Sequence, residues 1–273
     1  MRGAIAMSGT SMRLHRSWSS AAGWICLYGS GLLIALGLKA FYSRAGADEL
    51  TWILAPTAHL AELLTGDPFQ RESRAGWISH SHRMILGPGC AGVNFLIIAF
   101  AAFFFSFAGK FKRPAGRCAW LAISLSGAYV LTLATNSLRI VAAIQLHEMD
   151  IYRGWITPQR VHRAEGVVVY CVALLLGYLI VERSLARLGA PMLRRPSFSP
   201  WIPLGWYLGL ALGVPLATRA YRGGEGPFLE HSALVLLICL SLALILRAPR
   251  MVGHGGAGPD GGNAGSDSPA ARC

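Results

Sequence analysis

The sequence predicts an all-α membrane protein, a polytopic helical bundle of about six transmembrane helices with one additional interfacial or re-entrant helix. Three observations predict this fold class. Of the 273 residues, 53% are hydrophobic and only 14% are charged, whereas a soluble domain usually carries about a quarter charged residues. The hydrophobic residues form blocks long enough to cross a bilayer. The basic residues lie in the short segments between those blocks, where they orient membrane helices.

The chain begins with a polar, basic segment, residues 1–17, which we expect to be cytoplasmic. Residues 18–41 form the first hydrophobic block, and this block is long enough to span a bilayer. The sequence Ala45-Gly46-Ala47 that follows it is typical of a signal-peptidase site. Because the block is longer than the hydrophobic region of a signal peptide, we expect an uncleaved first span.

Residues 50–64 are apolar but too short for an ordinary span, and they contain Pro56, His59 and Glu62. We therefore expect an interfacial or re-entrant helix here. The next stretch, residues 66–86, is polar and predicts a loop exposed on one side of the membrane.

Later hydrophobic blocks predict the remaining spans. The second to sixth spans are expected at residues 89–108, 118–146, 164–181, 201–217 and 231–246. The block at 201–217 is weaker because Pro203, Pro215 and several glycines interrupt it. Residues 248–273 are polar and rich in glycine, which predicts a disordered tail.

The distribution of basic residues predicts the orientation of these spans. Arg and Lys, with few acids, are concentrated in the N-terminus, residues 109–117, residues 182–200 and the tail. With six spans, all of these segments lie on one side, which the positive-inside rule makes the cytoplasm. Residues 43–88, 147–163 and 218–229 then face outward. If residues 50–64 also spanned, the N-terminus and residues 109–117 would lie on opposite sides, against the rule.

One of the six cysteines, Cys90, stands at the start of a predicted span. No two cysteines have the spacing of a zinc or redox pair. We expect the others to be packing or tail residues: Cys26, Cys118, Cys171, Cys239 and Cys273. Cys90 differs because small residues surround it, including Gly92, so a substrate backbone can come close. The unpaired amides and dipole of an outer helix N-terminus favour a thiolate. Asn94, one turn further in, is placed to orient a neighbour by a hydrogen bond.

Two basic residues are predicted at the same outer face. Arg139 lies more than a turn inside the third span, where a charge costs several kcal/mol unless it is partnered. Asn136 shares its helix face; the alternative is an Arg139 side chain that extends to the outer surface. His162 directly precedes the fourth span. A thiolate, an imidazole and a guanidinium on one face permit acyl transfer at a peptide carbonyl, with Arg139 stabilising the oxyanion.

These residues resemble the signatures of the exosortase/archaeosortase family, most closely the exosortase K type. The signatures read Cys90-Ala91-Gly92, Asn136-Ser137-Leu138-Arg139 and His162-Arg163-Ala164-Glu165-Gly166, in family order. Two upstream segments, Leu54-Ala55-Pro56-Thr57 and Leu63-Leu64-Thr65-Gly66, also look like the family sequence before the cysteine. The exosortase-like membrane core covers residues 18–185, and residues 186–247 form a C-terminal helical extension outside it.

The resemblance implies a cysteine transpeptidase or peptidase in the bacterial inner membrane, with its active site facing the periplasm or exterior. Such enzymes cleave a C-terminal sorting signal, which consists of a Pro-Glu-Pro-type motif, a transmembrane helix and a basic cluster, and pass the protein to a surface acceptor. The resemblance makes Cys90 the nucleophile, Arg139 the transition-state stabiliser and His162 the acid/base. Gly92, Asn94, Asn136 and Gly166 are expected to support them. No cofactor or metal is implied; the partners are protein substrates and membrane lipids.

Other functions are less well supported by the sequence. A transporter or assembly factor with Arg139 lining a polar pathway would be expected to show an internal repeat or a paired intramembrane acid, and we find neither. A metalloenzyme using His80, His82 and His147 lacks a carboxylate at a recognised spacing. The net charge of +12 does not indicate nucleic-acid binding, because the basic residues lie in short loops that meet anionic lipid.

Overall fold

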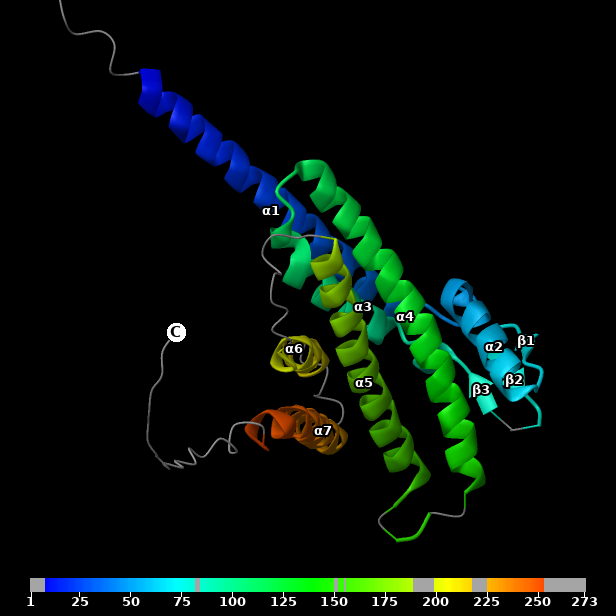
Figure 1. Cartoon of the computed structure of the whole chain (residues 1–273). Coiled ribbons are helices and arrows are strands. Elements are labelled where there is room, and N and C mark those ends of the chain that lie inside the picture. The colour runs from blue at the N-terminus through cyan, green and yellow to red at the C-terminus, as the bar shows by residue number, and fades with distance from the viewer. Residues whose placement is uncertain are drawn as a thin grey trace, which may run out of the picture.

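The computed structural model describes residues 8–81, 84–149, 152–154, 156–188, 199–217 and 225–252. Within them the chain is mainly helical (Figure 1). The helices are α1 (Ser8–Tyr42), α2 (Thr51–Thr65), α3 (Val93–Phe107), α4 (Pro114–Glu148), α5 (Pro158–Arg187), α6 (Trp201–Ala217) and α7 (Glu225–Val252). The predicted class, an all-α polytopic bundle, is confirmed.

Five segments in helices are long and apolar enough to cross a membrane: Ala22–Tyr42, Pro88–Lys110, Pro114–Glu148, Pro158–Arg187 and Phe228–Leu246. The chain is therefore a multi-pass membrane protein. The predicted fifth span corresponds to α6, whose 17 residues fall short of the roughly 20 needed to cross a bilayer. Pro203 lies in the first turn, where proline is tolerated, whereas Pro215 lies inside the helix, only two residues before its end at Ala217.

Helix α3 is the centre of the bundle. Its sequence is hydrophobic on every face, and 12 of its 15 residues are buried. Helices α1, α4, α5 and α6 all pack against it. Phe103 and Phe104 of its aromatic run are buried, and Phe105 stacks on Trp206 of α6 and on Tyr28 of α1. This run is therefore packing surface rather than lipid-facing surface.

The segment predicted as an exposed loop contains a small antiparallel sheet. Its strands, in the spatial order β1-β2-β3, are β1 (Gln70–Glu72), β2 (Gly76–Ser79) and β3 (Met84–Leu86). Gly76 has φ 114°, and a Cβ there would overlap the Leu86 carbonyl oxygen, so only glycine fits. Trp77 is buried, so the prediction of a simple loop was wrong. The sheet lies beside α2, at the end of the bundle where α4 ends (Figure 1).

Helix α2 is the short helix that the sequence predicted, and it is not among the candidate spans. It ends at Gly66, which takes the left-handed conformation with φ 79°. One face, including Ile53, Leu54 and Ala58, is buried and packs toward α4. Leu63 on the other face is 80% exposed, which suits a helix lying against lipid.

Four helices, α1, α4, α5 and α7, are longer than the spans that the sequence predicted, and α1 already begins at Ser8, inside the segment predicted to precede the first span. Helix α5 begins at Pro158, after Thr157 caps it by accepting a hydrogen bond from the Arg160 amide. His162 therefore lies inside the helix, not in the loop before it. Helix α7 continues to Val252, so its last turn covers the first residues of the segment predicted as a tail. The rest of that tail, residues 253–273, lies outside the described residues.

Cys171 of α5 and Cys239 of α7 meet in the packed interior. Their sulfur atoms are 3.6 Å apart, and both residues are buried. They act as small packing residues between these helices, as expected. Two other cysteines that were expected to be packing residues, Cys26 and Cys118, are exposed on the protein surface.

The contact between α1 and α3 predicts an effect of one glycine substitution. A Cβ on Gly31 would overlap the ring of Phe104, which is fully buried and has little room to move. We expect Gly31→Ala to destabilise the bundle by about 1–3 kcal/mol. The measurement is the fraction of protein that stays monodisperse in detergent after heating.

Gly37→Ala is the matched control, because Gly37 lies on the same helix with nothing within 4 Å of the added Cβ. Equal heat resistance of the two variants would contradict this α1–α3 packing.

Candidate active site

Cys90 lies in a short 3-10 helix, η1 (Pro88–Cys90), directly before α3. It is therefore two residues outside the α3 N-cap, Gly92, rather than in the first helical turn as predicted. The turn is anchored from α1, since the Tyr42 hydroxyl donates a 3.1 Å hydrogen bond to the Pro88 carbonyl. The Cys90 side chain is partly buried.

Gly92 allows this turn to lie against α4. Its φ of 71° is a left-handed conformation that favours glycine. A Cβ there would also lie only 3.2 Å from Asn136 Cγ and from Thr132 Cγ2. The Cys-x-Gly spacing thus serves a close approach between the cysteine turn and α4.

Asn136 connects the Cys90 turn to α5. Its buried amide nitrogen donates a 2.5 Å hydrogen bond to the Cys90 carbonyl oxygen. Its amide oxygen accepts a 2.9 Å hydrogen bond from the Tyr170 hydroxyl. Both ends of the amide are therefore satisfied, as a buried polar group requires.

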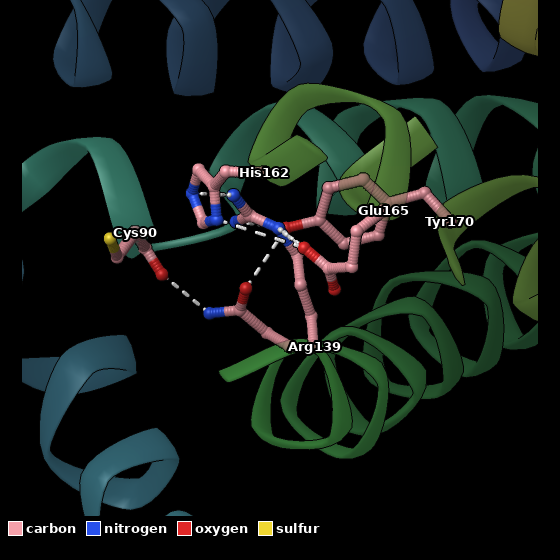
Figure 2. A network of polar contacts seen from close by, with 6 residues as sticks. Cys90, Arg139, His162, Glu165 and Tyr170 are labelled. Atoms are coloured by element: carbon pink, nitrogen blue, oxygen red, sulfur yellow. Dashed lines mark hydrogen bonds and ion pairs between the residues drawn. The ribbon is translucent and has the colours of Figure 1, made fainter. Parts of the chain in front are cut away.

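Cys90 joins this network through its backbone rather than its side chain. Figure 2 shows the Cys90 carbonyl oxygen turned toward the network and the sulfur turned away from it. Within the described part of the chain, the sulfur makes no hydrogen bond with Arg139 or His162.

Arg139 is the hub of the polar contacts in Figure 2. One terminal nitrogen, Nη1, donates to the Tyr170 hydroxyl at 3.3 Å, and the other, Nη2, lies 2.7 Å from His162 Nε2. Its Nε is 3.7 Å from Glu165 Oε2. The side chain is 11% exposed, so the alternative that it extends to the outer surface is wrong.

These contacts leave donors available. A guanidinium carries five N–H groups. The two hydrogen bonds to Tyr170 and His162 each use one N–H of a terminal nitrogen, and Nε–H faces Glu165. One N–H on each terminal nitrogen remains available to a further acceptor.

Gly166 lets Arg139 lie against the α5 backbone. A Cβ on Gly166 would be 2.9 Å from Arg139 Nε, closer than side chains normally approach. Gly166 is one turn beyond His162, so the two residues share a helix face. The His-x-x-x-Gly spacing therefore puts two features next to the Arg139 guanidinium. One is the His162 imidazole, and the other is the bare backbone at Gly166.

His162 also forms part of the wall of a pocket of about 280 Å³. The pocket lies between β3, the end of α4, the connection that follows it and the start of α5. Its other lining residues are Met84, Ala143, Leu146, His147, Tyr152, Pro158, Gln159 and Val161. The His162 side chain is 46% exposed, so it is accessible from this side.

Sequence reasoning missed two residues of the network, Glu165 and Tyr170. Helical spacing could have indicated both, because Glu165 is three residues after His162 and Tyr170 is four residues after Gly166. The expectation that no paired intramembrane acid exists was wrong, because Glu165 lies beside Arg139. That argument against a transporter therefore fails.

Asn94 lies apart from the network. It is exposed, and it accepts a 2.9 Å hydrogen bond from Lys39 of α1. It does orient a neighbour, but that neighbour is not at the site. The His147 ring lies 6.3 Å from the Tyr152 ring in a tilted arrangement, whereas His82 lies outside the described residues. Among the described residues, no three His, Cys, Asp or Glu side chains are grouped so as to hold a metal ion.

No protein-family profile, curated protein or solved structure matches the chain. The resemblance to exosortases therefore rests on the sequence motifs alone.

The Asn136 contacts predict a stability effect and a change in thiol reactivity. Asn136→Ala leaves the Cys90 carbonyl and the Tyr170 hydroxyl without this partner, which costs about 1–3 kcal/mol. We expect a lower midpoint of thermal unfolding. We also expect faster alkylation of Cys90 by N-ethylmaleimide, measured by peptide mass spectrometry relative to exposed Cys118 in the same molecule.

The matched control is Asn94→Ala. Its exposed amide accepts a hydrogen bond from half-buried Lys39, and its loss should change stability by less than about 0.5 kcal/mol. A Cys90 labelling rate that is the same in both variants would show that Asn136 does not hold the cysteine turn.

Proposed function

We propose that this chain is a membrane-embedded cysteine transpeptidase or peptidase of the exosortase type. Its substrate would be a protein with a C-terminal motif, transmembrane helix and basic cluster, cut at the outer face of the membrane and passed to a surface acceptor. The observation that best supports this proposal is the Arg139–His162 contact, linked through Tyr170 and Asn136 to the Cys90 backbone. All three motifs of the resemblance contribute residues to this one network.

The first half of the reaction forms a thioester. The Cys90 thiol gives its proton to His162 Nε2, and a sulfur electron pair forms a bond to the substrate carbonyl carbon. The carbonyl electron pair moves to oxygen, and the oxyanion accepts hydrogen bonds from the Arg139 guanidinium. When the carbonyl re-forms, the C–N bond breaks, and His162 returns the proton to the leaving amine.

The second half releases the product. An acceptor amine, or water for hydrolysis, gives a proton to His162 and attacks the thioester carbon. The tetrahedral intermediate collapses, the C–S bond breaks, and the sulfur regains a proton from His162. Transfer and hydrolysis therefore differ only in the attacking group.

In the resting arrangement, Arg139 Nη2 holds the His162 nitrogen that must accept the thiol proton. In the proposed reaction, the neutral carbonyl oxygen of the bound substrate takes over the Nη2 N–H that faces His162, which frees Nε2 before the oxygen becomes anionic. The sulfur would turn toward His162 at the same stage. Catalytic contacts commonly tighten only in the substrate complex.

One observation favours a second candidate function. The Arg139–Glu165 pair within the spanning helices suits a transporter or assembly factor with Arg139 lining a polar pathway. The two candidates make opposite predictions for Cys90, which only the enzyme requires.

The enzyme reading predicts complete dependence on Cys90. The chain is co-expressed with a tagged reporter that ends in a Pro-Glu-Pro motif, a transmembrane helix and an Arg-rich tail. We expect the unmodified chain to cleave the reporter. Cys90→Ala should lower the rate of cleavage by more than about 1,000-fold, because loss of a nucleophile is rarely compensated. Mass spectrometry should find an acyl group on Cys90 during turnover.

Cys118→Ala serves as the control, since Cys118 is exposed on α4 outside the polar network. Reporter cleavage that persists in Cys90→Ala, or an acyl group trapped on another cysteine, contradicts the thiol mechanism.

The proposed outer location predicts opposite results for two reporter fusions that bracket α4. Alkaline phosphatase fused after Gly154 should be active, because it folds only outside the cytoplasm. Green fluorescent protein fused after Arg113 should fluoresce, because it folds inside. The reverse pattern would place Cys90 at the cytoplasmic face and contradict cleavage outside.

A further inference from the structure

Glu165 carries a buried carboxylate that has no part in the proposed reaction. Its side chain is 6% exposed, and neither of its oxygens has a hydrogen-bond partner among the described residues. A buried carboxylate without such partners is costly, so a nearby positive charge has to compensate it. Arg139 is that charge.

Glu165 Oε2 is equally close to two groups of the site. It lies 3.7 Å from Arg139 Nε on α4 and 3.7 Å from His162 Nδ1, one turn earlier on α5. In Figure 2 the Arg139 guanidinium lies between Cys90 and Glu165. Glu165 therefore contacts both functional side chains without standing next to the cysteine.

Two contacts, with Arg139 on one ring nitrogen and with Glu165 on the other, together favour one tautomer of the His162 imidazole. A guanidinium only donates hydrogen bonds, so His162 Nε2, at 2.7 Å from Nη2, must accept. A neutral imidazole then has its proton on Nδ1, and Nδ1 faces the Glu165 carboxylate, which only accepts. The donors and acceptors match in this one arrangement.

We propose that Glu165 is a positioning residue of the site, a role that rests on the proposed function for its catalytic meaning. Its carboxylate holds His162 in the Nδ1–H tautomer, so that Nε2 is the nitrogen that takes the Cys90 proton. The same carboxylate balances the charge of Arg139. When His162 becomes an imidazolium during the reaction, Glu165 stabilises it from the Nδ1 side, as a carboxylate does in Ser-His-Asp sites.

Two variants, whose new side chains are similar in size to glutamate, test whether Glu165 acts through its carboxylate or only fills space. Glu165→Gln keeps an oxygen that accepts from Nδ1–H but removes the charge, and Glu165→Leu removes both. Glu182→Leu is the matched control. Glu182 is a second buried glutamate of α5, and it lies 17 residues further along the helix, roughly 25 Å away.

The first measurement is turnover of the tagged reporter by the full-length protein in proteoliposomes. We expect Glu165→Leu to lower kcat by about 100-fold to 10,000-fold with little change in KM. Glu165→Gln should be intermediate, and Glu182→Leu should stay within about twofold of the unmodified protein. Equal loss in the Leu and Gln variants, or wild-type turnover in Glu165→Leu, overturns the proposal.

The second measurement needs no activity. Nitrogen-15 NMR of histidine-labelled protein in bilayers, with His162→Gln to assign the signal, reports the tautomer directly. We expect one Nδ1–H form in the unmodified protein and in Glu165→Gln, and a mixture in Glu165→Leu. A single unchanged tautomer in Glu165→Leu overturns the proposal. If Cys90→Ala still cleaves the reporter, the proposed enzyme fails while this NMR result still decides the role of Glu165 toward His162.

Discussion

The site depends on how a guanidinium is accommodated inside a membrane helix bundle. Arg139 is almost fully buried, and a charge at that depth is stable only if other groups surround it. Tyr170, His162 and Glu165 supply those groups, all from α5. The need to satisfy one charge therefore sets the packing of α4 on α5, and the absence of a side chain at Gly166 makes the approach sterically allowed.

The same constraint explains which parts of the fold the sequence predicted. Hydrophobic blocks located the helices well, and α6 has the bounds of its predicted block because apolar residues begin and end there abruptly. The sequence did not show that α3 is central, since a helix apolar on all faces looks the same whether protein or lipid surrounds it. The sheet was missed because its strands are only three or four residues long, too short for a clear alternation.

For the site, motif spacing predicted which helix ends meet but not how their side chains pair. Arg139 and His162 are in direct contact, as their shared face suggested. The early start of α5 was missed, although Thr157-Pro158 is a typical helix start. Glu165 was overlooked because its importance appears only when α4 brings a guanidinium beside α5, which is a contact between helices that no local pattern encodes.

The hydrogen bond from Asn136 to the Cys90 carbonyl has a consequence for dynamics. It fixes the main chain of the cysteine but places no restraint of its own on the side-chain torsion. The sulfur can then move between staggered positions by rotation about a single bond, which takes picoseconds to nanoseconds at accessible side chains. In the proposed enzyme, delivery of the sulfur to a bound peptide would therefore begin with a rotamer change on a backbone that is already held in place.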